Sequence, residues 1–241
     1  MTELDIWHAQ VSEEIIEPER PIIDPHHHLW RMGTPYELDD LWADTKAGHN
    51  ITGTVFIECG AEYRADGPAA LRPVGETEYV VAQAKQARKG EAPGKPPILG
   101  IVSHADLTLG AAVVDVLEAH QESAEGLLRG IRHSTAFYPD PPAVDRYAGR
   151  VAELMLQPSF REGFAQLSSA GLSYDAWLLH TQITELTDLA RAFPDTMIIL
   201  DHFGGPLGIG PYSGKQAELF PQWKADIVEL ARCENVVAKL G

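Results

Sequence analysis

Residues 22–30 read Ile-Ile-Asp-Pro-His-His-His-Leu-Trp, and this stretch decides most of the interpretation. Two β-branched residues begin an extended segment, in which alternate side chains face the same way. Asp24, His26 and His28 therefore share one face of the predicted strand. Two imidazoles two positions apart at a strand end can converge on one metal ion or one substrate oxygen. Asp24 is placed to orient a ligand or to tie down the strand end. The alternative, a solvated histidine tract, is disfavoured by the apolar residues directly before it.

Short apolar runs alternate with longer amphipathic stretches along the chain, and such runs are typical of parallel strands buried on both faces. The predicted strands are Pro21–Asp24, Thr54–Glu58, Ile98–Ser103, Leu128–Arg132, Leu172–Leu179, Met197–Leu200 and Val236–Leu240. The predicted helical stretches are Glu76–Lys89, Leu109–His120, Val144–Ala170, Gln182–Ala192 and Lys215–Cys233. This alternation indicates a parallel α/β protein, which is either an open doubly wound sheet or a closed barrel.

A second histidine stands where another buried strand ends. The strand Met197–Leu200 runs into Asp201-His202, and two glycines then allow a tight turn. In a barrel, polar residues at the carboxyl ends of the strands point to the catalytic mouth. We therefore expect His202 to meet His26 and His28. The alternative is a histidine whose ring is satisfied within its own turn.

Two further strand ends carry candidate substrate-binding residues. Arg132 ends the fourth predicted strand, and a guanidinium there suits bidentate recognition of a carboxylate. A structural ion pair at the rim is the alternative for Arg132. His180 closes the fifth strand segment and is either a substrate contact, a metal ligand or a structural histidine.

Four ordered segments carry a resemblance to a known family: DPHHHLW (24–30), GIRH (130–133), FPDTMIILDHFGGP (193–206) and NVVAKLG (235–241). The set resembles the amidohydrolase-related family of TIM-barrel hydrolases, which includes fuconolactonase-like, sulfomuconolactone hydrolase-like and pyrone-dicarboxylate lactonase-like enzymes. The resemblance implies a TIM-type (β/α)8 barrel over residues 21–241, preceded by an N-terminal extension over residues 1–20. It also implies an aspartate on strand eight that activates water. No residue here matches that aspartate, so we expect a barrel truncated after strand seven.

The resemblance further implies a hydrolase that acts on a carboxylated lactone or similar cyclic ester. His26, His28 and His202 would polarise the scissile carbonyl, directly or through a divalent metal. The expected ion is Zn²⁺ with His26, His28 and His180 as ligands, although some members of the family use no metal. Two alternatives stay open: a non-oxidative decarboxylase on a related barrel, and an inactive barrel fragment. Without the strand-eight aspartate we expect the 241-residue chain to be nearly inactive. If it does hydrolyse a lactone, Asp201 and Glu58 are the first candidates for the general base.

The charge balance restricts the partners. The 241 residues hold 35 acidic and 19 basic side chains, for a formal net charge of −16, which disfavours nucleic acid. An anionic small-molecule substrate must therefore be received by a local cationic pocket. Two cysteines, no signal peptide and no apolar run of about 20 residues predict a cytoplasmic protein without a membrane partner. Unpaired first and seventh strands predict poor solubility or homo-oligomers.

Overall fold

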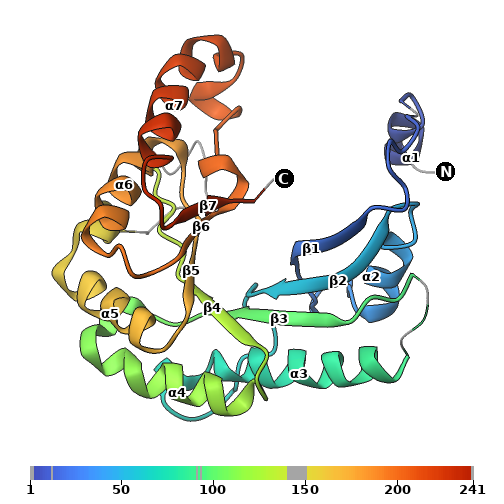
Figure 1. The fold of residues 1–241 in the computed structure, drawn as a ribbon, viewed down its shortest axis with the longest axis horizontal. Helices are drawn as coiled ribbons and strands as arrows, with labels where there is room; N and C mark the ends of the chain where they lie inside the picture. Colours follow the sequence, from blue (N-terminus) through green and yellow to red (C-terminus); the bar gives the residue numbers. More distant parts are fainter. Residues whose placement is uncertain (1–2, 12, 91, 93, 140–150, 240–241) are drawn as a thin grey trace.

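The computed structural model describes residues 3–11, 13–90, 92, 94–139 and 151–239, and its centre is one curved parallel sheet (Figure 1). The seven strands of this sheet pair in chain order, each with the next, and every pairing is parallel. The strands are β1 (Pro21–His27), β2 (Asn50–Ile57), β3 (Ile98–Ser103), β4 (Leu128–Arg132), β5 (Ser173–Ala176), β6 (Ile198–Leu200) and β7 (Val236–Ala238). The sheet is thus an incomplete TIM-type barrel of seven strands, which confirms the predicted fold class.

Helices cover the convex side of the sheet (Figure 1). The α-helices are α1 (Glu3–His8), α2 (Leu38–Asp44), α3 (Val74–Lys89), α4 (Val113–Ser123), α5 (Pro158–Ser169), α6 (Ile183–Ala192) and α7 (Gln216–Leu230). Short 3₁₀ turns join several of them: η1 (Ala69–Leu71), η2 (Leu107–Ala112), η5 (Leu154–Leu156), η6 (His180–Gln182), η7 (Asp201–Gly204) and η8 (Gly210–Tyr212). This right-handed strand–helix–strand winding brings every strand's carboxyl end to the same rim.

Two apolar clusters hold the helices to the sheet. One lies under β1–β3 and includes Leu41, Trp42 and Phe56, all at most 5% exposed. The larger one lies under β4–β6 and includes Phe164 and Tyr174, both fully buried. The hydroxyl of Tyr174 is satisfied within this apolar cluster, because it donates a hydrogen bond to the backbone oxygen of His133. The clusters therefore fix both halves of the curved sheet.

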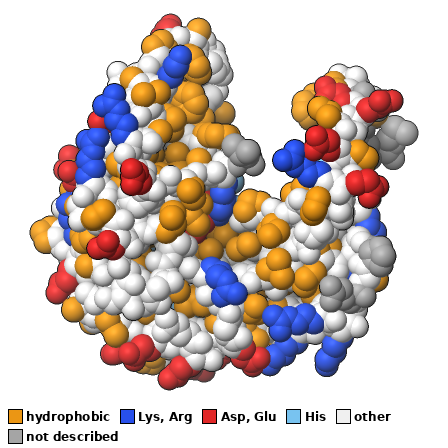
Figure 2. All heavy atoms as spheres, viewed as in Figure 1, with side chains coloured by type: hydrophobic (Ala, Val, Ile, Leu, Met, Phe, Trp, Pro, Cys, Tyr) orange, Lys and Arg blue, Asp and Glu red, His pale blue; other side chains and the backbone are white. Residues whose placement is uncertain are grey.

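The concave side of the sheet is partly open. Among the described strands, β1 pairs only with β2 and β7 pairs only with β6. A cavity of about 560 Å³ lies inside the curve and is walled mainly by aliphatic side chains, two of which, Ile23 and Val237, are 54% and 48% exposed. Figure 2 shows hydrophobic side chains along the hollow between the two ends of the sheet.

Most predicted elements are found, with shifted ends. β1 extends to His27, three residues beyond its predicted end, and α4 begins at Val113 because η2 precedes it with a kink at Gly110, where φ is 61°. The helix predicted over Val144–Ala170 contains η5 and α5, and its first seven residues lie outside the described part of the chain. Helices α1 and α2 were not predicted. Nowhere in the described ranges is a helix long and apolar enough to cross a membrane.

Candidate active site

The paired histidines lie where β1 ends. The rings of His26 and His28 meet edge to face with centroids 5.0 Å apart, as their shared strand parity predicts. His28 Nδ1 lies 2.7 Å from the backbone oxygen of Ile57, which can only accept. Neutral His28 therefore carries its proton on Nδ1, and Nε2 is left as an acceptor or a ligand. His27 has the opposite parity and packs against Phe56.

Asp24 serves the strand rather than a ligand. Its Oδ1 accepts a hydrogen bond of 3.0 Å from the backbone amide of His26. This bond ties down the strand end at the point where the β1–β2 register shifts. Of the two roles predicted for Asp24, the structure supports the second.

His202 reaches the pair from the turn after β6. Its ring centroid is 4.7 Å from that of His26 and 5.1 Å from that of Trp177. Its backbone is left-handed, with φ 47°, and so is that of Phe203, with φ 51°. Each non-glycine residue in this conformation costs roughly 1–2 kcal/mol. Trp223 of α7 donates a 3.0 Å hydrogen bond to the backbone oxygen of Phe203 and holds this turn. The structure thus brings His26, His28 and His202 together.

Arg132 at the end of β4 crosses the mouth of the sheet. Its Nε donates to Glu58 Oε1 at 2.7 Å, and its Nη2 donates to the backbone oxygen of Glu58. Its Nη1 lies 3.4 Å from Asp201 Oδ2 and 3.4 Å from His26 Nε2. The guanidinium fork is therefore engaged by protein partners. This arrangement matches the ion-pair alternative for Arg132, and its predicted contact with a substrate carboxylate stays a prediction.

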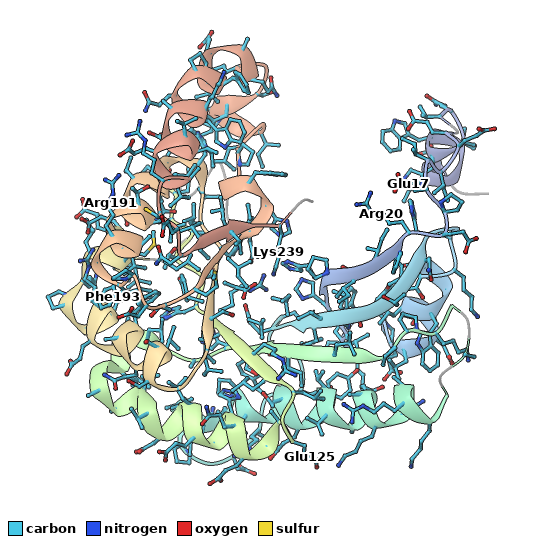
Figure 3. The ribbon with its side chains drawn as sticks, in the orientation of Figure 1. Glu17, Arg20, Glu125, Arg191, Phe193 and Lys239 are labelled. Carbon is cyan, nitrogen blue, oxygen red and sulfur yellow. The ribbon has the colours of Figure 1, made fainter. Side chains whose placement is uncertain are left out.

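Lys239, one residue past β7, supplies a second buried cation on the concave side (Figure 3). Its Nζ lies 2.5 Å from Asp175 Oδ1, 3.0 Å from Asp201 Oδ1 and 3.4 Å from His26 Nδ1. Both carboxylates are fully buried. Sequence reasoning assigned no role to Lys239 or Asp175. The rule that singled out Arg132, a charged residue at a strand end, would have found Lys239 but not Asp175, which lies in the middle of the predicted strand Leu172–Leu179.

Burial and the two cations set the protonation of the site. The pKa of His26 is lowered to about 2, first by burial and then by Lys239. The pKa of His28 is also lowered, chiefly by burial. Burial raises the pKa of Asp175 to about 6, against the opposing effect of Lys239. At neutral pH the imidazoles of His26 and His28 are therefore uncharged.

Near Glu58 the site opens into a polar cavity of about 380 Å³. Tyr63, His104 and His133 line it, and the last two rings meet edge to face at 5.4 Å. The Glu58 side chain is 15% exposed, while that of Asp201 is fully buried. Solvent and a small polar substrate can thus approach Glu58 from this side.

Behind Glu58, the loop after β2 is fastened to α3. Glu76 Oε1 accepts hydrogen bonds from the backbone amides of Cys59 and Ala61, at 2.9 and 2.8 Å. Glu76 is 2% exposed, and burial raises the pKa of its carboxyl to about 7. This side chain positions the loop that begins with Glu58.

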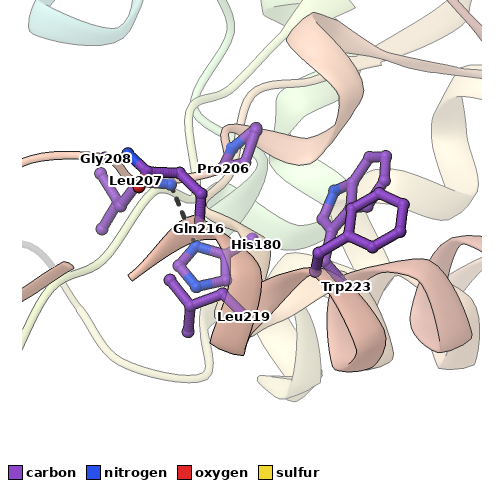
Figure 4. A pocket seen from close by; sticks show the side chains of 8 residues that line it. His180, Pro206, Leu207, Gly208, Gln216, Leu219 and Trp223 are labelled. Carbon is purple, nitrogen blue, oxygen red and sulfur yellow. Dashed lines mark hydrogen bonds between the residues drawn. The ribbon is translucent and has the colours of Figure 1, made fainter. Parts of the chain in front are cut away.

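His180 lies apart from the histidine cluster. Its Nδ1 accepts a 3.4 Å hydrogen bond from the backbone amide of Leu207 (Figure 4). Its ring packs against that of Tyr212. It lines a largely apolar cavity of about 470 Å³ that is bounded by residues of α7. The structure therefore does not bring together the predicted ligand set His26, His28 and His180.

The residues present do not fit a divalent ion in this arrangement. Both ring nitrogens of His26 face a cation, Arg132 on one side and Lys239 on the other. A dication bound to His26 would be repelled by both at short range. Within the described ranges, no three His, Cys, Asp or Glu side chains are grouped so that they could hold a metal.

A family model, a curated protein and several solved structures are similar to this chain. The family model described as Amidohydrolase matches residues 23–241. The uncharacterized protein y4mH of Sinorhizobium fredii is 31% identical, over 91% of this chain and 72% of its own length. A zinc-bound amidohydrolase from Burkholderia multivorans has a TM-score of 0.63 at 21% identity, covering 90% of this chain and 68% of that one. A probable 2-pyrone-4,6-dicarboxylic acid hydrolase from Acinetobacter baumannii, with citric acid bound, has a TM-score of 0.54 at 13% identity, with coverage of 90% and 68%.

Proposed function

This chain belongs to the amidohydrolase family, and on that premise we propose that it hydrolyses a lactone or similar cyclic ester that bears a carboxylate. The observation that carries the proposal is the meeting of His26, His28 and His202 at the ends of β1 and β6. One of these rings, that of His26, contacts two buried cations, Arg132 and Lys239. Imidazole rings beside cationic side chains offer donors to the oxyanion that forms when water attacks an ester carbonyl.

The three histidines have different roles in this proposal. Neutral His28 presents only an acceptor at Nε2, so it can orient the attacking water but cannot donate to a carbonyl oxygen. The donor must therefore come from His202, from His26 or from a neighbouring cation. His202 is the first choice because its turn projects the ring toward His26 at the mouth of the sheet.

A carboxylate must take the proton from the attacking water. Asp201 and Glu58 are the two candidates from sequence. Glu58 borders the polar cavity, whereas Asp201 is fully buried and faces Lys239. We therefore propose Glu58 as the general base, in place of the strand-eight aspartate that the resemblance implies. The carboxylated substrate is supported by the pyrone-dicarboxylic acid hydrolase among the similar structures, and by the cationic residues at the rim.

The experiment is a hydrolysis assay of the purified chain with five- and six-membered lactones, each offered with and without a carboxylate. We expect turnover of carboxylated lactones and its loss in His28→Ala and His202→Ala. His49→Ala is the matched control, because His49 is exposed and remote from this cluster in sequence. Release of carbon dioxide without ring opening would indicate that the chain is a decarboxylase and not a lactone hydrolase. No turnover of any lactone would refute the proposal.

A further inference from the structure

The ammonium group of Lys239 lies against one nitrogen of His26 and one oxygen of Asp201. His26 Nδ1 and Asp201 Oδ1 lie 3.7 Å apart. Two ligand atoms of a tetrahedral zinc ion are separated by roughly 3.4 Å, because each lies about 2.0–2.2 Å from the ion. The two protein atoms are therefore spaced as a pair of ligands would be. Lys239 Nζ lies against both, at 3.4 and 3.0 Å.

The buried carboxylates of Asp175 and Asp201 can accept further hydrogen bonds or bind a cation. Asp175 Oδ2 and Asp201 Oδ1 have no hydrogen bond within the described part of the chain, although both side chains are fully buried. An ammonium group offers three donors in fixed directions, and Lys239 directs one of them to Asp175 Oδ1. The contact with Asp201 Oδ1 is an ion pair without hydrogen-bond geometry. A small dication would use such oxygens more completely than an ammonium group does.

We propose that the ammonium of Lys239 occupies the place between His26 and Asp201 in which a divalent cation would otherwise bind, so that Lys239 and a metal ion exclude each other. Lys239 is then a positioning residue: it holds Asp175, Asp201 and His26 in place from within the concave side. Its removal leaves two fully buried carboxylates beside the imidazole of His26 with Arg132 as the one remaining cation in contact with them among the described residues, and this set repels a dication less than the unchanged site does. The proposal goes beyond the hydrolytic function and does not depend on which substrate is used.

The test is a titration of metal-free protein with Co²⁺, followed by visible absorption and by the rise in unfolding temperature. Lys239→Met and Lys239→Gln remove the ammonium, and the glutamine variant keeps a donor for Asp175. We expect both to bind Co²⁺ at least about tenfold more tightly than the unchanged chain, because a like charge about 3–4 Å from the ion is gone. Lys239→Arg keeps the charge and should bind no better. Lys224→Met, at an exposed position on α7, is the matched control.

Every outcome of this titration decides the question. Neutral variants that fold only when Co²⁺ is present would support the exclusion, since the ion then replaces the missing ammonium. Neutral variants that fold at no Co²⁺ concentration would overturn it, and so would equal affinities in Lys239→Met and the unchanged chain. Because the readout is metal binding, a chain that hydrolyses no lactone leaves this result standing.

Discussion

Replacing Glu76 by glutamine should change how stability depends on pH. The carboxyl pKa is raised from 4.5 to about 7 by burial, so the folded state favours the protonated form. For such a group the stabilising contribution is complete below pH 4.5 and is lost as the pH rises to 7. The folded and unfolded pKa values differ by about 2.5. A pKa difference of one corresponds to about 1.4 kcal/mol, so the full difference corresponds to about 3 kcal/mol. The unchanged chain should therefore lose up to about 3 kcal/mol between pH 4.5 and 8 through this one group.

Glu76→Gln keeps the oxygen that accepts from Cys59 and Ala61 but cannot ionise. Its amide nitrogen takes the place of Oε2, which has no hydrogen-bond partner among the described residues, so a buried donor stays unpaired at a cost of about 1 kcal/mol. We expect the variant to be slightly less stable at pH 5 and about 2 kcal/mol more stable at pH 8. Urea unfolding followed by tryptophan fluorescence at several pH values measures this crossover. Glu78→Gln is the control, because Glu78 is exposed and ion-paired to Arg64. Parallel stability curves for the unchanged chain and Glu76→Gln would refute the reasoning.

Three other substitutions test the site and the fold. Arg132→Lys should raise KM for a carboxylated lactone about tenfold or more, because lysine cannot offer a substrate carboxylate the planar fork of donors that arginine does. Unchanged kinetics would restrict Arg132 to its ion pairs with Glu58 and Asp201. Glu58→Gln should lower kcat by about a hundredfold if Glu58 accepts the proton from water, and a loss confined to KM would point to Asp201 instead. Gly163→Ala should destabilise the fold by about 1–3 kcal/mol, because its Cβ would lie 2.1 Å from the backbone oxygen of Leu107; thermal unfolding beside the exposed Ser169→Ala measures this.

The sequence predicted the strands well because buried parallel strands are short, apolar and bounded by turns. β3 and β4 have the predicted ends, and the parity rule placed His26 and His28 together. The sequence pattern could not predict which side chains meet on the concave side of the sheet. The contacts of Lys239 with Asp175 and Asp201 join strand ends that are far apart in the chain, and only the curvature of the sheet makes them neighbours.

The prediction for His180 shows the same limit. A histidine at a strand end was expected to face the mouth. β5 ends earlier than predicted, at Ala176, so His180 begins a 3₁₀ turn instead and its ring packs against Tyr212. Strand ends are the least certain part of a sequence pattern, and side-chain direction alternates with each residue. A small error in an end is therefore enough to send a ring elsewhere.

His26 and Lys239 belong to opposite margins of the curved sheet, the first on β1 and the second one residue past β7. Their approach to 3.4 Å is therefore a bridge across the open side of the barrel. The spacing of the reacting groups is thereby coupled to how far the sheet bends. A distance probe between β1 and β7 would therefore report the spacing of His26 and Lys239 together with the curvature of the sheet.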